Sequence, residues 1–285
     1  LSYQDIHASA QGVRGDPNFT ALYCSVPIPF ILMYVKIYKD IINRSILFVC
    51  LILLISAIIF TYSMGGAIGL IAIFIFFVLF QKNISLLKKA IRFFLLIPIF
   101  VGIFFLSPDS FKQRIQDKYN VIRHEDFSKW GTGRGDRWLQ GLNIIKENSI
   151  IGVGLGNSKK IIFYYPNRNT YKNTEAHNTL LTIAAENGIF GVFLFVLFTG
   201  LILRKLVSKL NILASINDNN LLYFGSAIYI SIIAFLIQAM FLETLFDKYL
   251  WILLGLAATF IKITEQSEKI DCRSCPVQDR VRSTV

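Results

Sequence analysis

Charged residues are scarce in this chain of 285 residues. Asp, Glu, Lys and Arg make up 16% of it, against roughly 25% in a soluble globular domain. Hydrophobic residues make up 54% and are clustered into long runs. This composition excludes an ordinary soluble domain and is typical of a membrane protein. We therefore predict an all-α, polytopic transmembrane helical bundle, because helices satisfy every backbone polar group inside lipid.

Cysteine is also rare, and its four copies do not form a disulfide framework. Cys24 and Cys50 lie in or beside hydrophobic runs, where cysteine is a small apolar filler. Cys272 and Cys275 form a lone C-x-x-C, without the further ligands that a zinc or redox site needs. We predict no metal site and no cofactor. Internal repeats, low-complexity linkers and a signal-peptide pattern are absent as well.

Seven hydrophobic runs are candidate membrane spans, of which the first, fourth and last are short against the roughly 20 residues that a bilayer requires. The chain begins at Leu1 and not at Met, so we expect an N-terminal truncation and count seven spans for this fragment only. The predicted spans are Phe19–Val35, Ile46–Tyr62, Gly65–Phe80, Ile91–Leu106, Thr179–Leu203, Leu221–Leu242 and Tyr249–Ile263.

The net charge of +11 has two interpretations, nucleic-acid binding and membrane topology. Topology fits better, because Lys and Arg cluster after the first, third and fifth spans, as the positive-inside rule requires. We predict no nucleic-acid partner, an external loop over about Ser107–Ala176 and a cytoplasmic C-terminus. The chain then divides into an N-terminal bundle (1–106), the external loop (107–176), a C-terminal bundle (177–263) and a cytoplasmic tail (264–285).

The external loop contains a predicted helix over Arg134–Asn148, because Trp138, Leu142 and Ile145 recur on one face. Thr132 is the predicted cap of its start. The glycines at 152, 154 and 156 lack the Lys-Ser/Thr ending of a phosphate loop, so we interpret them as a tight turn that returns the chain to the membrane.

Two residues of the loop are candidates for chemistry. The guanidinium of Arg134 offers a planar fork for phosphate oxygens, and the alternative is a solvated arginine or a lipid headgroup contact. His177 precedes the fifth span, where an imidazole accepts a hydroxyl proton near neutral pH. The alternative for His177 is an interfacial side chain that caps the helix.

Six further residues are candidates for a functional role. Arg137 and Trp138 are candidate substrate contacts, although Arg137 points away from the face of Trp138. Asn178 either orients a substrate or caps a helix, and Arg14 is a second phosphate contact or part of a turn. Glu243 and Asp247, between the last two spans, bind a sugar or a cation or, as we expect, lie in a solvated turn. Ionisable residues are nearly absent within the spans, which argues against a pump or an ion-coupled transporter.

An ordered set of motifs resembles the O-antigen ligase and O-antigen polymerase superfamily over roughly Gly12 to Ile263. The motifs are Thr132-Gly133-Arg134-x-x-x-Trp138, Ile151-Gly152-Val153-Gly154-Leu155-Gly156-Asn157, His177-Asn178-Thr179-Leu180-Leu181 and Ala185-Glu186-Asn187-Gly188-Ile189-Phe190-Gly191, with Gly15-Asp16-Pro17-Asn18 upstream. The chain departs from the superfamily at Met64, where members often carry an arginine, and Arg14 is a candidate replacement.

The resemblance implies a multi-pass glycosyltransferase of the bacterial inner membrane that uses no nucleotide sugar and no metal. Its donor is a polyprenyl-diphosphate-linked glycan, and its active site faces the periplasm. By the motif match, Arg134 contacts the donor diphosphate and His177 activates the acceptor hydroxyl. Two activities stay open, a ligase that uses a lipid A-core acceptor and a polymerase that joins repeat units, while a glycolipid transporter is disfavoured.

Overall fold

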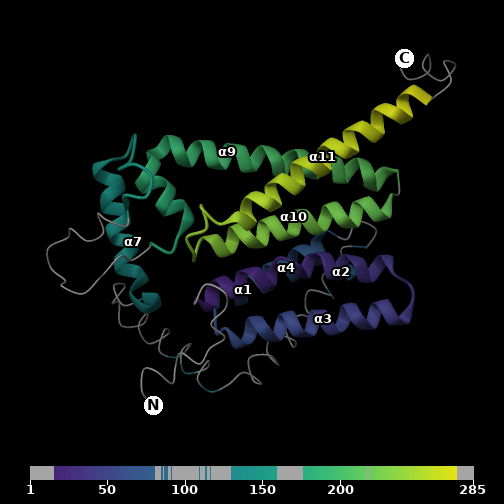
Figure 1. Ribbon diagram of the computed structural model, residues 1–285, viewed down its shortest axis with the longest axis horizontal. Helices are drawn as coiled ribbons and strands as arrows, with labels where there is room; N and C mark the ends of the chain where they lie inside the picture. Colours follow the sequence, from purple (N-terminus) through teal and green to yellow (C-terminus); the bar gives the residue numbers. More distant parts are fainter. Residues whose placement is uncertain are drawn as a thin grey trace.

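The computed structural model describes residues 16–80, 130–158, 176–216 and 218–274, together with isolated positions between 81 and 129. Every regular element in these ranges is an α-helix. Figure 1 shows a bundle of long helices that run side by side, with one helix across its end. The helices are α1 (Pro17–Ser25), α2 (Ile28–Ile37), α3 (Ile41–Phe60), α4 (Met64–Leu79), α7 (Trp130–Glu147), α9 (Thr179–Ser215), α10 (Asn219–Ala239) and α11 (Lys248–Ser274).

The all-α membrane class is confirmed, because four stretches are long and apolar enough to span a bilayer. They are Pro17–Ile37, Ile41–Phe60, Thr179–Ser215 and Asn219–Ala239. The helix Met64–Leu79 is apolar but shorter, and the predicted span Ile91–Leu106 lies outside the described residues. The count of seven spans therefore stays a prediction.

The first predicted span consists of two helices, because α1 ends at Ser25 and α2 begins at Ile28. Pro27 and Pro29 lack the N–H groups that would continue the helical ladder. The backbone carbonyl of Val26, freed by this break, accepts a hydrogen bond from the Ser231 hydroxyl of α10 at 2.8 Å. A polar side chain of a neighbouring helix thus replaces the missing backbone donor, as bilayer interiors require.

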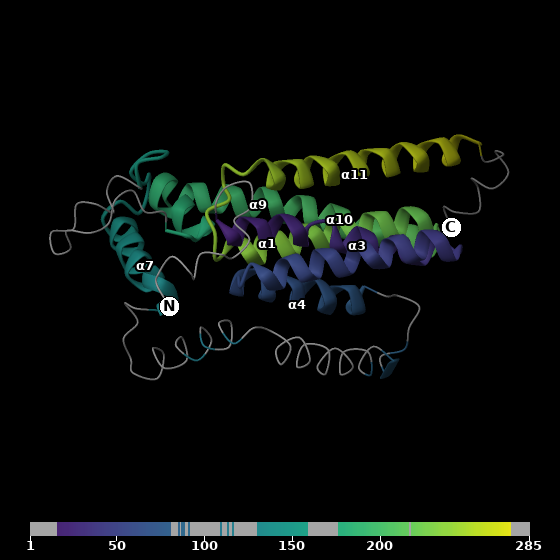
Figure 2. The same cartoon turned by 60° about the horizontal axis from the view of Figure 1, so that its bottom comes forward.

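Helix α10 occupies the centre of the bundle and packs against α2, α4, α9 and α11. Its small residues, which include Gly225, Ser226 and Ala227, allow this close approach. Two apolar cores form around it, one with α9 and α11 and one with α1, α2 and α4. Figure 2 shows α3 and α4 on one flank of this stack and α11 on the other.

Helix α9 bends sharply at Gly188, which has φ 65° and ψ −166°. A Cβ atom on Gly191 would lie 2.3 Å from Asn187 Cβ and 3.5 Å from Ile183 Cγ2. Residues eight apart in a straight helix are about 12 Å apart along the axis, so the two parts of α9 form a V. We call residues 179–187 the outer arm and residues 189–215 the long arm of α9. The sequence predicted one continuous span here.

The segment 148–158 fills the outside of this bend. The backbone N–H groups of Val153 and Gly154 donate to the carbonyls of Ala185 and Glu186, both at 2.9 Å. The Ile189 N–H donates in turn to the Ser149 carbonyl at 2.9 Å. The glycines at 152, 154 and 156 all have positive φ, so this segment is a succession of turns. It satisfies carbonyl groups that the interrupted helix leaves without partners.

Four helices begin at one end of the bundle, which we call the cap end. Side-chain hydrogen bonds connect their starts: Ser63 Oγ to Asn18 Oδ1 at 2.7 Å, Tyr23 Oη to Asp247 Oδ2 at 2.5 Å, and Thr179 Oγ1 with Thr244 Oγ1 at 2.9 Å. These contacts bring together the N-termini of α1, α4, α9 and α11. Helix N-termini carry partial positive charge, and the C-termini of α3 and α10, which lie at the same end, carry partial negative charge.

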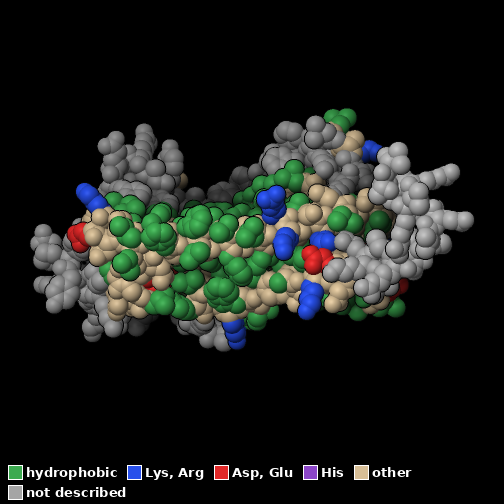
Figure 3. Space-filling view, turned by 90° about the horizontal axis from the view of Figure 1, so that it is seen from above, with side chains coloured by type: hydrophobic (Ala, Val, Ile, Leu, Met, Phe, Trp, Pro, Cys, Tyr) green, Lys and Arg blue, Asp and Glu red, His purple; other side chains and the backbone are tan. Residues whose placement is uncertain are grey.

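Apolar side chains cover the middle of the outer surface, and basic side chains of α9 gather away from the cap end (Figure 3). The residues Phe193, Leu197 and Leu201 of the long arm are exposed, and Arg204, Lys205 and Lys209 follow them. This is the distribution that a membrane-embedded bundle with the cap end outside would have.

Candidate active site at the cap end

Helix α7 lies across the cap end beside the outer arm of α9 (Figure 1). Trp138 contacts Ala176, Gly141 faces Leu181, and Ile144 packs with Ala185. Residue numbers rise together along both segments, so α7 and the outer arm run in the same direction. This arrangement places Arg134, one turn before Trp138, at the start of α9 and not along its side.

The observed α7 begins at Trp130 and ends at Glu147, where the sequence predicted Arg134–Asn148. Thr132 is therefore inside the helix, and its prediction as the cap was wrong. The pattern of apolar residues marked only the stretch of the helix that packs, and α7 extends one turn beyond it toward its N-terminus. Gly131 and Gly133 made that turn a poor candidate from propensity alone.

Arg134 is half-buried on α7, and its buried Nε has no hydrogen-bond partner among the described residues. Burial lowers the pKa of Arg134 from its ordinary value, the Asp16 carboxylate opposes this shift, and Arg137 lowers the pKa further. A guanidinium nitrogen that is buried without an acceptor is unfavourable. An anion placed beside it would supply both the missing acceptor and the compensating charge.

Arg137 lies within electrostatic range of Arg134, which is three residues away on the same helix. Arg137 is also half-buried, and its Nε is buried. Arg137 was predicted to point away from the face of Trp138. In the structure its charge nonetheless lies close enough to Arg134 to lower the pKa of that residue. Two clustered cations next to helix N-termini form a surface that suits a multiply charged anion such as a diphosphate.

His177 lies immediately before α9 and has a φ of 50°, which side-chain-bearing residues rarely adopt. Such a conformation costs on the order of 1–3 kcal/mol and persists where the surroundings fix it. Ala176, on one side, accepts a hydrogen bond from Trp138 Nε1 at 3.0 Å. Asn178, on the other side, caps α9 by accepting from the Leu181 N–H at 3.1 Å. His177 is thus held between two fixed neighbours.

Asn178 is 8% exposed and caps α9. Of its two interpretations, a substrate contact and a helix cap, the structure shows the cap. The indole N–H of Trp138 likewise bonds to the protein backbone. Arg14 lies outside the described residues, but the neighbouring Asp16 caps α1 and lies near Arg134. The structure thus links Trp138 to the segment that contains His177 and Asn178, and it places Arg134 and Arg137 on the same helix as Trp138.

The prediction of a solvated turn at Glu243 and Asp247 was wrong, because these residues are only 8% and 1% exposed. The turn folds back over the start of α9, where Thr179 Oγ1 donates to the Leu242 carbonyl at 2.8 Å. Asp247 accepts hydrogen bonds from Tyr23 Oη and from the Tyr249 N–H. Sequence alone gave no sign of this folding back, because the contacts join residues far apart in the chain.

Glu186 is a further buried acid that the sequence analysis did not single out. It is 1% exposed, and its Oε1 accepts a hydrogen bond from Ser158 Oγ at 2.7 Å. Its Oε2 is buried without a hydrogen-bond partner among the described residues. A charged residue within a predicted membrane span was the available sign of a special role.

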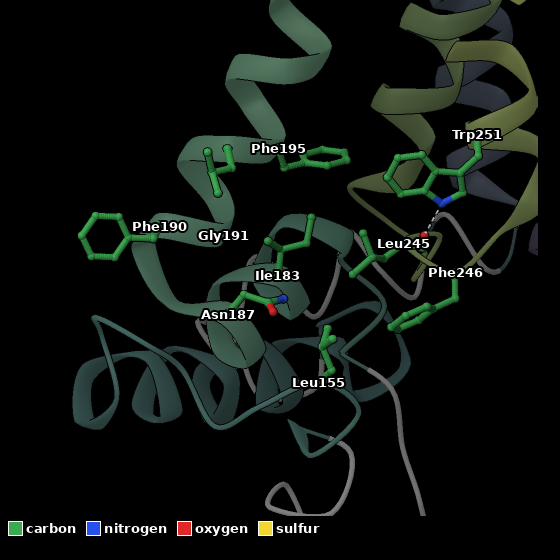
Figure 4. A pocket seen from close by; sticks show the side chains of 10 residues that line it. Leu155, Ile183, Asn187, Phe190, Gly191, Phe195, Leu245, Phe246 and Trp251 are labelled. Carbon is green, nitrogen blue, oxygen red and sulfur yellow. Dashed lines mark hydrogen bonds between the residues drawn. The ribbon is translucent and has the colours of Figure 1, made fainter. Parts of the chain in front are cut away.

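A pocket of about 500 Å³ lies within the V of α9 (Figure 4). Asn187, Phe190 and Leu194 line it from the two arms, and Phe246 and Trp251 close it from the α10–α11 turn. Trp251 Nε1 donates to the Leu245 carbonyl at 2.8 Å, which fixes that turn. The lining is apolar apart from the Asn187 amide and continues into the exposed apolar face of the long arm, so the pocket suits a hydrocarbon chain.

A sequence profile described as O-antigen ligase matches residues 49–196, just over half of the chain. The chain belongs to the O-antigen ligase family. The match runs from α3 to the long arm of α9, so it includes Arg134, His177 and the bend at Gly188. Members of the O-antigen ligase family are glycosyltransferase-like ligases and polymerases of membrane glycans. No curated protein matches the chain in sequence.

No group of three or more His, Cys, Asp or Glu residues that could bind a metal ion is found in the described ranges. The polar groups at the cap end of this O-antigen ligase family member include guanidinium, imidazole, amide and hydroxyl groups, with the carboxylates of Asp16 and Asp247. These groups can bind an anion, orient a hydroxyl and accept a proton.

Proposed function

We propose that this protein transfers a glycan from a polyprenyl-diphosphate donor to an acceptor hydroxyl, at the outer face of a bacterial inner membrane. The observation that carries the proposal is the placement of Arg134 on α7 one helical turn before Trp138, whose indole bonds to the residue that precedes His177. Membership of the O-antigen ligase family supports the reaction class.

Arg134 would bind the diphosphate of the donor, with Arg137 beside it. In the transfer, the acceptor oxygen forms a bond to the anomeric carbon of the glycan, and the bond from that carbon to the diphosphate breaks. The polyprenyl diphosphate leaves with the electron pair. Fixed positive charge in a partly dry site stabilises that departing charge more than water would.

His177 would accept the proton of the acceptor hydroxyl as the new glycosidic bond forms, and would release that proton to solvent after the transfer. The imidazole lies at the N-terminus of α9, where the acceptor and the donor diphosphate would meet. Holding both reactants at the cap end supplies the proximity that a reaction between two bulky substrates requires.

The pocket within the V of α9 would receive the hydrocarbon chain of the donor near the diphosphate. Its apolar lining continues the exposed face of the long arm, so a chain could enter it from the lipid. The α10–α11 turn that closes the pocket also bonds to Thr179 beside His177. Chain and head group would therefore bind to connected parts of the fold.

Replacement of Arg134 tests the proposal. We expect Arg134→Ala to reduce transfer by at least about a hundredfold, because removing a charged partner of a developing anion costs roughly 2.7–4 kcal/mol. Transfer would be measured in proteoliposomes with a polyprenyl-diphosphate glycan and an acceptor, after matching the amount of membrane-inserted protein.

Lys146→Ala is the matched control, because Lys146 is an exposed cation near the other end of α7. It removes one positive charge from the same helix and should leave the transfer rate within about twofold of wild type. Full activity of Arg134→Ala, or equal losses in both variants, would contradict the proposed role of Arg134.

A further inference from the structure

Trp138 connects the helix that carries Arg134 to the segment that carries His177. Its indole Nε1 donates to the Ala176 carbonyl at 3.0 Å, and Ala176 is only 4% exposed. Ala176 directly precedes His177, so the hydrogen bond fixes the peptide through which the histidine enters its left-handed conformation.

The opposite side of His177 is fixed independently. Asn178 is extended, at φ −154°, and accepts the Leu181 N–H. Thr179 donates to the Leu242 carbonyl and accepts the Thr244 N–H at 2.9 Å. These contacts fix the C-terminal side of His177, and the hydrogen bond to the Ala176 carbonyl fixes its N-terminal side.

Arg134 and Trp138 are four residues apart on α7, a rise of about 6 Å along the helix axis. One rigid helix therefore carries the guanidinium that would bind the diphosphate and the indole that holds the histidine segment. The guanidinium and the indole therefore keep a fixed spacing on α7, and the indole links that helix to the peptide before His177.

We infer that Trp138 is a positioning residue for His177, and that its indole N–H fixes where the imidazole lies relative to the anion held by Arg134. The inference rests on the proposed function and departs from the sequence prediction that Trp138 binds substrate. A residue of this kind affects the rate of the chemical step and leaves donor binding unaffected.

The test combines Trp138→Phe with His177→Ala in a double-mutant cycle of the full-length chain. Trp138→Phe keeps an aromatic ring and removes the N–H donor, so we expect kcat to fall about tenfold for one lost hydrogen bond. The donor KM should stay within about twofold. In the His177→Ala background, measured with long incubations, Trp138→Phe should cause no further loss, because the group that it positions is gone.

Trp251→Phe is the matched control, because Trp251 also donates its indole N–H to a backbone carbonyl, at 2.8 Å. Any effect of Trp251→Phe should be the same with and without His177. A raised donor or acceptor KM in Trp138→Phe, or losses that multiply with those of His177→Ala, would overturn the inference.

A second variant keeps the shape of the indole. Incorporation of benzothienylalanine at position 138 replaces the N–H group with sulfur, so it removes the donor even if Trp138→Phe does not accumulate. It should reproduce the fall in kcat, and wild-type kcat in this variant would overturn the inference. Arg134→Ala, assayed in parallel, separates the two proposals: active Arg134→Ala would contradict the proposed function, whereas additive losses at 138 and 177 would contradict only the positioning role.

Discussion

At the scale of single residues, Gly152 and Gly188 lie at one close backbone contact between segments that are far apart in the chain. A Cβ atom on Gly152 would lie 2.4 Å from the Glu186 carbonyl carbon, and one on Gly188 would lie 2.1 Å from the Ile150 carbonyl oxygen. The motifs around positions 152 and 188 are thus two sides of one backbone contact. Both motifs were recognised in the sequence, but their contact was not predicted, because the spacing of residues along a chain does not show which of them meet in the fold.

This contact predicts the effect of adding one methyl group. We expect Gly188→Ala to destabilise the protein by more than about 2 kcal/mol, because alanine resists positive φ and its Cβ would meet backbone atoms. Gly200→Ala on the same helix meets no atom within 4 Å, and should be neutral or stabilising by up to about 1 kcal/mol. Thermal unfolding in detergent measures both, and equal melting temperatures for the two variants would contradict this view of the bend.

At the scale of helices, the hydrophobic runs predicted where helices lie but not where they bend. The helices α3, α4 and α10 begin and end within a few residues of the predicted spans, because each is an uninterrupted apolar run. Hydrogen bonds from distant parts of the chain stabilise both irregularities. Ser231 bonds to the break after Ser25, and the segment 148–158 bonds to the bend at Gly188. The burial of Glu243 and Asp247 escaped prediction for the same reason.

The V of α9 leads to a prediction about the donor chain. Leu194→Trp would fill part of the pocket, so we expect the KM for a full-length polyprenyl donor to rise about tenfold, the equivalent of losing roughly two buried methylene groups. A donor with a short, water-soluble chain should be unaffected. Phe193→Trp is the control, because the neighbouring Phe193 is 59% exposed and does not line the pocket. An equal change for both donors, or for both variants, would argue against a chain in this pocket.

At the scale of the whole molecule, the site depends on where the helices begin. Helices α1, α4, α9 and α11 all start at the cap end, and α7 adds two guanidinium groups to it. The four N-termini and the two arginines favour an anion there, and the C-termini of α3 and α10 and the carboxylates of Asp16 and Asp247 oppose it. The sequence predicted Arg134 and His177 through family motifs, but the convergence of four helix starts follows from the topology. Only the folded chain brings Asp16, Ser63 and Asp247 to the same end as His177.

Under the proposed function, the cap end would bind donor and acceptor in a ligase and in a polymerase alike. The glycan that cells make therefore distinguishes the two activities. If the protein is a ligase, cells deleted for the gene should lose the surface glycan ladder and retain long polymer on the polyprenyl lipid. If it is a polymerase, the surface glycan should shrink to a single repeat unit, because single units can still be transferred when they are not joined. Gel analysis of surface glycan, with lipid-linked intermediates extracted in parallel, separates these outcomes. Complementation by wild type but not by Arg134→Ala would assign the effect to the cap end, whereas an unchanged ladder and unchanged intermediates would contradict both activities.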